Sequence, residues 1–288
     1  MTRKGTVVAV VVLTALVAIT AITHYRSWSL SQLASGGWPP QEPVVLLSWP
    51  TPVATLEVSR QLYAYLETPT AYCRRLQLLG GSCSSSGALS GHTLLCRDDA
   101  YAPESGQCLV YSASSAGEWS FARDAARYQC EVHVFDPALT TSTPRPEHTA
   151  GVQFHRLGLA GRGRTETGVQ ALTLSELKEK VGHAGRVIDF LRVDVQGDEW
   201  GWLERDIEAL SDVRQLGVRV YLSLDSLRRH HGLLWQLQAL GLRLVYSAAD
   251  SATGRAWDVE GVDGKVAVVY DLVFINRRRC RATFGCGA

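Results

Sequence analysis

Asp136 is the first residue whose surroundings in the sequence suggest chemistry. It ends the apolar run Glu131–Phe135, and it follows a block of very small residues, Ser112–Gly117, that comes after another apolar run, Cys108–Tyr111. Small residues let a backbone approach a ligand closely, and an acid about 20 residues after such a turn can accept hydrogen bonds from both hydroxyls of a ribose. The pattern predicts a nucleotide-binding βαβ unit. The alternative is a plain crossover in which Asp136 only caps the turn at Pro137.

Asp194 lies near the end of a further apolar run, Val187–Val195, and Asp198 and Glu199 follow it closely. Ligands bind at the carboxyl ends of parallel strands, where a carboxylate can align a hydroxyl or take its proton. We therefore assign Asp194 as the first catalytic candidate and Glu199 as the second. The alternative for Glu199 is that it only favours the amino end of the helix expected near Trp200. One acid with its neighbours is a weak cation site, so we assign no metal.

These acids need a sheet to position them, and the rest of the chain supplies strands and helices in alternation. Helices are expected at Leu56–Leu66, at Trp119–Tyr128, from the capping box that starts at Thr173, at Trp200–Leu210 and at Leu227–Leu240. Further strands are expected at Val152–Leu157, Leu216–Leu222, Leu242–Ser247 and Val266–Ile275, and a loop at Leu78–Gly91. No helical pattern separates the last two strands, so they should pair antiparallel. An α/β fold with a mostly parallel sheet and an antiparallel last strand is the Rossmann-like class I methyltransferase fold.

Several stretches resemble the methyltransferase-like protein 24 group, which is related to the FkbM-type methyltransferases. They are CEVHVFDP (130–137), DFLRVDVQGDEWGWLE (189–204) and YDLVFIN (270–276). The resemblance implies an S-adenosylmethionine-dependent, membrane-anchored enzyme of the secretory pathway that methylates an oxygen of an unknown acceptor. The general plan of the fold then assigns the parts of the cofactor. Its methionine part would contact Ser112, Ala113, Ser114 and Gly117. Its ribose would contact Asp136, and its adenine would contact Leu157 and Gly158.

The small-residue turn departs from that group, because Ser114 and Ala116 stand where its members have glycines. Serine and alanine still permit close approach, but a positive φ at either position would cost on the order of 1 kcal/mol or more. The departure leaves a second function open, in which the same fold is a catalytically inactive binding or scaffolding module. A nicotinamide-dependent oxidoreductase is disfavoured, because the G-x-G-x-x-G pattern is missing.

The amino-terminal region predicts a membrane anchor. Residues 6–23 are almost wholly apolar and uncharged, close to the ~20 residues that a helix needs to cross a bilayer. Basic residues before them favour a type II orientation, with a cytoplasmic tail (1–5) and a lumenal or extracellular domain (55–288). Residues 24–54 would form a stem between the membrane and this domain. The Golgi or the endoplasmic reticulum is the expected location. A signal peptide cleaved near Ala21 and Thr23 is the alternative.

Seven cysteines agree with an oxidising compartment, with Cys73–Cys83, Cys96–Cys108 and Cys280–Cys286 as candidate local pairs. Cys108 and Cys130 could instead be buried as free thiols in their strands. The net charge of +1 gives no indication of a nucleic-acid partner. None of the cysteines shows a CxxC spacing, so the sequence does not predict a zinc site. His133 and His155 are expected to be core or surface histidines, with His155 on the opposite face from Phe154, and His230–His231 to lie on a solvated helix face.

Overall fold

The computed structural model describes residues 55–83, 89–114, 119–140, 151–160, 168–250, 256–260 and 262–281. All of them fall in one compact unit, Leu46–Ala288. The predicted membrane segment (6–23), its tail (1–5), the stem (24–54) and Gly117 lie outside the described residues. Within those ranges, no helix combines the length and apolar character that crossing a bilayer requires.

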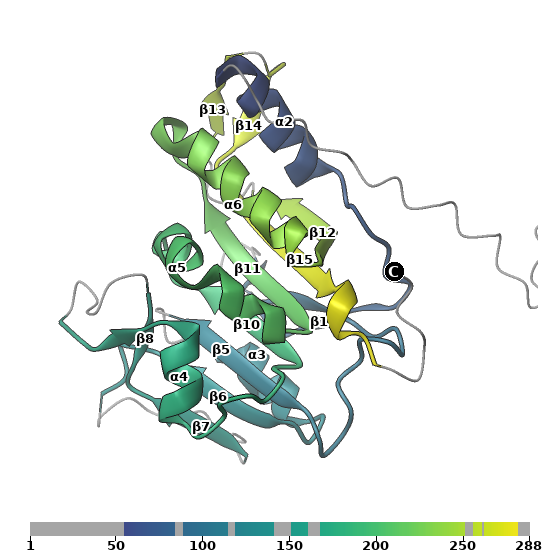
Figure 1. Cartoon of the computed structure of the whole chain (residues 1–288), viewed down its shortest axis with the longest axis vertical. Helices are drawn as coiled ribbons and strands as arrows, with labels where there is room; N and C mark the ends of the chain where they lie inside the picture. The colour runs from purple at the N-terminus through teal and green to yellow at the C-terminus, as the bar shows by residue number, and fades with distance from the viewer. Residues whose placement is uncertain are drawn as a thin grey trace, which may run out of the picture. The chain divides into compact units, whose positions relative to one another are not determined.

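A seven-stranded sheet forms the centre of the fold, in the order β12–β15–β11–β10–β5–β6–β7 (Figure 1). Five neighbouring strands run parallel: β5 (Leu109–Ser114), β6 (Glu131–Phe135), β7 (Val152–His155), β10 (Phe190–Asp194) and β11 (Gln215–Tyr221). The last strand, β15 (Val269–Asn276), lies antiparallel between β11 and β12 (Leu242–Ala249). The predicted mostly parallel sheet with an antiparallel last strand is confirmed.

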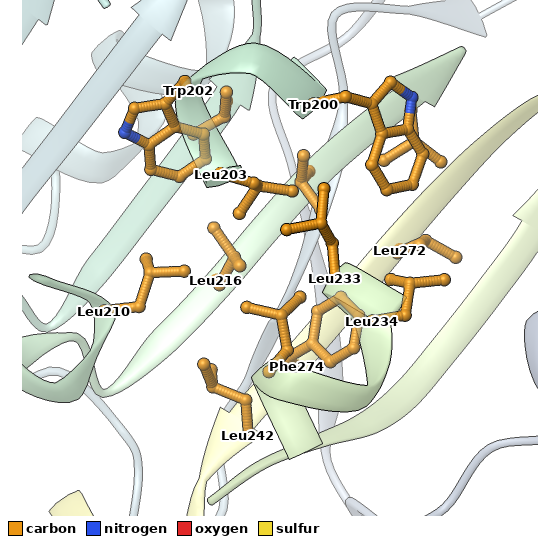
Figure 2. Packing of buried hydrophobic residues seen from close by; sticks show 14 of the residues in the cluster. Trp200, Trp202, Leu203, Leu210, Leu216, Leu233, Leu234, Leu242, Leu272 and Phe274 are labelled. Carbon is orange, nitrogen blue, oxygen red and sulfur yellow. The ribbon is translucent and has the colours of Figure 1, made fainter. Parts of the chain in front are cut away.

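Helices cover both faces of this sheet. The larger apolar core joins one face to α2 (Thr55–Glu67), α4 (Leu174–Lys180), α5 (Glu199–Asp206) and α6 (Leu227–Ala239). Figure 2 shows Trp202 and Leu203 of α5 and the α6 leucines lying against strand residues such as Leu216 and Phe274. The second core lies on the other face, where Phe121 of α3 (Ser120–Ala126) packs with Val110 and Phe190. Alternate strand residues therefore face two different cores, as strand geometry requires.

The capping box predicted at Thr173 is present and opens α4. The Thr173 hydroxyl accepts from the amide of Glu176 at 3.2 Å, and the Glu176 carboxylate accepts from the amide of Thr173 at 2.8 Å. Gly182, with φ of 76°, follows the end of this helix. The left-handed conformation is the usual helix terminator and suits glycine. A local rule of sequence is thus enough to fix both ends of α4.

A hairpin of β1 (Leu76–Leu79) and β4 (Thr93–Cys96) packs over β11 and β15 on the α3 face. The expectation of a loop across 78–91 was therefore partly wrong, since β1 enters it and the short pair β2 (Ser82–Cys83) and β3 (Leu89–Ser90) lies within it. The hairpin comes so close to the sheet that a Cβ on Gly217 would lie 2.6 Å from Thr93 Oγ1. The remaining short elements are β8 (Gly158–Leu159), β9 (Ala171–Leu172), β13 (Ala256–Asp258), β14 (Lys265–Ala267) and the 3₁₀ turns η1 (Ile207–Asp212), η2 (Leu224–Ser226) and η3 (Arg277–Arg279).

Two disulfides join Cys73 to Cys96 and Cys108 to Cys130. The predicted pairs Cys73–Cys83 and Cys96–Cys108 were wrong, because nearness in sequence does not decide pairing. Cys108 and Cys130 immediately precede the neighbouring parallel strands β5 and β6. The sheet itself therefore brings them together. Cys280 is also disulfide-bonded, but Cys286 lies outside the described residues, so the pair Cys280–Cys286 stays a prediction.

The adjacent His230 and His231 of α6 do not lie on a solvated face, which corrects the sequence-based expectation. They are 1% and 4% exposed. The His230 ring stacks on Trp200 of α5 with a centroid distance of 3.9 Å. Burial lowers the pKa of His230 to about 4, and the nearby Arg229 adds to the shift. A neutral imidazole can pack as an aromatic ring. The buried face of α6 therefore includes both histidines as well as its leucines.

Candidate functional site

The predicted small-residue turn begins later than the sequence indicated. Ser112, Ala113 and Ser114 are the last residues of β5 and are all buried. They stay extended because β10 pairs with them in parallel, with Arg192 opposite Ser112 and Asp194 opposite Ser114. The two serines therefore share one sheet face with Arg192 and Asp194. Their side chains point to the sheet face that carries α3, and the candidate site therefore lies on that face.

A small polar pocket lies on this face beneath the β1–β4 hairpin, with a free volume of about 10 Å³, which is about enough for one water molecule. Its charged lining comes from three strands and one hairpin: Arg192, Asp194, Arg219, Asp271 and His92. Arg219 binds Asp271 at 2.9 Å, and Arg192 donates to Asp194 Oδ2 at 3.2 Å. Burial raises the pKa of Asp271, although the charge of Arg219 opposes that shift. The pocket is thus a buried charge network rather than a simple apolar cleft.

Arg192 and Asp194 each keep one polar atom without a partner in this network. Arg192 is 4% exposed. Its Nη1 atom and Asp194 Oδ1 are buried, and neither has a hydrogen-bond partner among the described residues. A buried polar group without a partner costs roughly 1–3 kcal/mol. A polar ligand that reached both atoms would recover this free energy, so the pair marks the place in the pocket best suited to binding.

Glu199 lies at the same sheet edge but in a different role from the one its sequence position suggested first. It is fully buried, and its two oxygens accept from the backbone amides of Gly197 at 2.8 Å and Tyr221 at 2.7 Å. Gln196 and Gly197, with φ of 54° and 114°, form a left-handed turn between β10 and α5. Glu199 therefore ties the turn after β10 to the end of β11. The geometry makes it a positioning residue, with both oxygens already engaged by the backbone.

Asp136 follows β6 at the expected place and is also fully buried. Its Oδ2 accepts from the indole nitrogen of Trp119 at 3.2 Å, and its Oδ1 accepts from the amide of Ala138 at 2.8 Å. Trp119 precedes α3 and packs edge-on against Phe154 of β7 at 5.1 Å. The bond to Ala138 is the turn-capping contact that the plain-crossover reading anticipated. The Trp119 indole thus occupies one acceptor position of Asp136 Oδ2.

Comparison with known families identifies the chain. A family model described as "Methyltransferase domain" matches residues 50–229. The chain belongs to this methyltransferase domain family. No curated protein matches it.

Three solved structures are similar to this methyltransferase domain at low sequence identity. Fibrillarin, a pre-rRNA processing protein of Methanococcus jannaschii, is 12% identical with a TM-score of 0.37, over 60% of this chain and 68% of its own. A protein of the NADB-Rossmann superfamily from Streptococcus agalactiae is 14% identical with a TM-score of 0.33, over 61% and 64%. CalO1, a methyltransferase in calicheamicin biosynthesis with SAH bound, is 12% identical with a TM-score of 0.29, over 58% and 49%. We transfer no residue role from them.

S-adenosylmethionine is the cofactor that membership of the methyltransferase domain family indicates. Asp136 fits the ribose as a hydrogen-bond acceptor, because a carboxylate can accept about four hydrogen bonds and Asp136 stands one crossover after the small-residue turn. Leu157 is buried, and so is Gly158 in β8, next to the third strand of the unit. Asp136, Leu157 and Gly158 are thus residues of the sheet's carboxyl edge that could hold the cofactor.

Arg192, Arg219, Asp271 and His92 are the residues of the pocket that sequence reasoning missed. A signal for the first was present: Arg192 and Asp194 are two apart in a strand, which places both side chains on one face. Arg219 and Asp271 each interrupt an apolar strand, and such an interruption indicates a buried charge with a partner. Their pairing depends on β15 lying beside β11, a fact of topology that no local pattern contains.

Glu199 should make the stability of the methyltransferase domain fall as the pH rises towards neutrality. Burial raises its pKa from 4.5 to about 7, although the backbone hydrogen bonds oppose the shift. Between pH 4.5 and about 7, Glu199 keeps a proton in the folded chain that it has lost in the unfolded chain. The free energy of unfolding is therefore greatest below the pKa of the unfolded chain. It decreases by up to ~3 kcal/mol as the pH rises through the pKa of the folded chain. Urea unfolding at several pH values should show this slope in the wild type and a flatter curve in Glu199→Gln. Glu204→Gln, on the exposed side of α5, should keep the wild-type slope.

Proposed function

We propose that this chain transfers a methyl group from S-adenosylmethionine to an oxygen of a glycan or small molecule in the secretory pathway. Membership of the methyltransferase domain family supports the reaction class, and the stretches similar to the methyltransferase-like protein 24 group support the finer assignment. The cofactor supplies an electrophilic methyl group when it is bound. The residues of this chain have to orient an acceptor, exclude water and receive a proton.

The position of Asp194 is the observation that best supports the proposal. Its carboxylate stands at the carboxyl end of β10, where it is only partly exposed, and Arg192 holds one oxygen while the other has no partner. A hydroxyl that entered the pocket would meet an acceptor at Asp194 Oδ1 and a donor at Arg192 Nη1. Asp194 would then take the hydroxyl proton as a general base, and Arg192 would fix the orientation of the acceptor. Glu199 keeps the turn beside Asp194 in place through the backbone of Gly197.

The disulfides support the proposed compartment. Cys73–Cys96 and Cys108–Cys130 belong to an oxidising environment, since cytosolic thiols are kept reduced. The apolar residues 6–23 with basic residues before them agree with a type II anchor in the Golgi or endoplasmic reticulum. In this arrangement the membrane is a partner through residues 6–23 alone, and the domain is lumenal or extracellular.

A catalytically inactive binding module is the second candidate, and the hydrogen bond from Trp119 to Asp136 is the observation that favours it. The Trp119 indole donates to Asp136 Oδ2, and the stretch before it in the sequence has Ser114 and Ala116 in place of glycines. A chain that had lost cofactor binding would have no need to keep that carboxylate open. In this case the pocket around Arg192 and Asp194 would bind a polar ligand without transforming it.

Calorimetric titration of the purified chain with S-adenosylmethionine separates the two candidates. The enzyme should give saturable heat and a raised melting temperature, because a ligand at about 100 times its dissociation constant stabilises the folded state by about 2.7 kcal/mol. Labelled cofactor incubated with a panel of hydroxylated glycans and small molecules should then yield methyl ethers that resist mild base. Absence of both heat and thermal shift at millimolar cofactor would remove the enzyme and leave the binding module.

A further inference from the structure

Three polar side chains converge at the start of β6, on the sheet face that carries α4. Glu131 and His133 are two residues apart in that strand, so both point to one face, and His183 follows α4 directly after Gly182. His133 and His183 are 2% and 6% exposed. Their Nε2 atoms lie 3.1 Å and 3.0 Å from the same oxygen, Glu131 Oε1. Two buried imidazoles and a partly exposed carboxylate thus converge on one point.

The remaining nitrogen of each imidazole is also held. His183 Nδ1 lies 2.8 Å from the Tyr111 hydroxyl, and His133 Nδ1 lies 2.9 Å from His155 Nε2. Histidines that bind a metal through one nitrogen almost always hydrogen-bond through the other, which fixes the ring and its tautomer. The second oxygen of Glu131 accepts from Arg186 at 2.7 Å. Every ligand atom in the cluster therefore already has the outer support that a metal site requires.

We propose that Glu131 Oε1, His133 Nε2 and His183 Nε2 bind one zinc ion, with water as the fourth ligand. In a tetrahedral zinc site with bonds of about 2.0–2.2 Å, neighbouring ligand atoms are about 3.3 Å apart. The separations of 3.0 and 3.1 Å come close to that value, and the three ligand atoms all lie within 4.8 Å of one another. A set of two imidazoles and one carboxylate suits zinc, whereas magnesium and calcium prefer oxygen ligands throughout.

The ion would bind away from the methyl-transfer site, and the proposal is independent of methyl transfer. Glu131 begins β6 and Asp136 follows its end, so the two are about 16 Å apart at about 3.3 Å per residue. The metal would join the start of β6 to the segment after α4. Both ends of this link are already held by backbone hydrogen bonds, from His183 N to Lys178 O at 2.7 Å and from Glu131 N to Cys108 O at 2.9 Å. Zinc would therefore add to the stability of the folded state rather than create the fold.

The same atoms can also form a closed hydrogen-bond network without a metal. In that case His133 and His183 each donate from Nε2 to Glu131, Tyr111 donates to His183, and His155 donates to His133. Zinc binding requires the Nε2 protons of His133 and His183 to move to Nδ1, and the Nε2 proton of His155 to move to its own Nδ1 so that Nε2 can accept from His133. The net protonation of the imidazoles does not change. The two states therefore differ in metal content and in tautomer, and an experiment can distinguish them.

The test is zinc binding by the full-length chain after it has been stripped with a chelator and dialysed. Titration with zinc chloride should give one ion per chain and a raised melting temperature. Glu131→Gln and His183→Gln should lose that site, and Tyr111→Phe, which removes the support of His183, should weaken binding by about 10- to 100-fold. His92→Gln, a histidine on the opposite face of the sheet, should bind zinc as the wild type does.

Cobalt(II) gives an independent readout, because a four-coordinate cobalt site with nitrogen ligands absorbs strongly in the visible range. The wild-type spectrum should show that band, and His183→Gln should not. Two outcomes would overturn the proposal: a wild-type chain that takes up no zinc, which would leave the hydrogen-bonded network, or uptake that is the same in Glu131→Gln, His183→Gln and the wild type, which would place the ion elsewhere.

Discussion

Asp194→Asn should lower methyl transfer by about 10²- to 10⁴-fold, the range expected when a general base is lost. Asparagine keeps the shape of the side chain and an oxygen that can accept from Arg192, but it cannot take a proton from a hydroxyl. Binding of S-adenosylmethionine should stay within error of the wild type, because Asp194 is assigned to the acceptor and not to the cofactor. Turnover is measured as conversion of labelled cofactor with the best acceptor from the glycan and small-molecule panel.

The matched control for this variant is Asp225→Asn, which removes an exposed carboxylate in η2. It should leave both turnover and cofactor binding unchanged. Melting curves of both variants establish that any loss is chemical and not a loss of fold. Turnover of Asp194→Asn equal to that of the wild type would show that Asp194 takes no proton, and the pocket would then have only a binding role.

The parts of the fold that depend on neighbouring residues were predictable from the sequence. The limits of β6, the capping box of α4 and the antiparallel last strand follow from period-two and period-3.6 patterns and from the lack of a crossover helix. Phe154 and His155 also lie on opposite faces as expected: Phe154 packs on Trp119, whereas His155 stacks on Phe135. Local periodicity fixes which way a side chain points, and this information was sufficient at these positions.

Features that depend on which strands become neighbours were not predictable. The disulfide Cys108–Cys130 exists because β5 and β6 start side by side, and β5 continues to Ser114 because β10 pairs with its end. The same limit applied to the site. Asp194 could be found from its place at a strand end, but its surroundings are made by Arg219 and Asp271, which only the completed sheet brings together.

For Asp136 the sequence predicted the position correctly, but it did not predict the contacts that decide its role. The sequence placed an acid one crossover after the turn, and the structure has it there. No pattern indicated that the Trp119 indole would donate to it, since that contact joins the residue before α3 to the residue after β6. The role of Asp136 as a ribose ligand therefore remains a prediction, to be decided by binding measurements.

Asp136→Ala should weaken S-adenosylmethionine binding by at least about 100-fold. Each hydrogen bond from a ribose hydroxyl to a charged carboxylate contributes about 1.5–3 kcal/mol, and two would be lost. The substitution also leaves the Trp119 indole nitrogen and the Ala138 amide without this acceptor, so the variant should melt at a lower temperature. Calorimetric titration below that temperature gives the affinity of the folded chain.

Trp119→Phe separates the effect on binding from the effect on stability. It keeps Asp136 and an aromatic ring against Phe154, but it removes the donor that occupies Oδ2. If the ribose takes the place of the indole, binding no longer has to displace a hydrogen bond, and Trp119→Phe should bind the cofactor at least as tightly as the wild type. Opposite changes in the two variants would mean that indole and ribose compete for one carboxylate. Equal affinity in Asp136→Ala and the wild type would mean that the acid only caps its turn, because a true ribose ligand cannot be removed without a large loss of affinity.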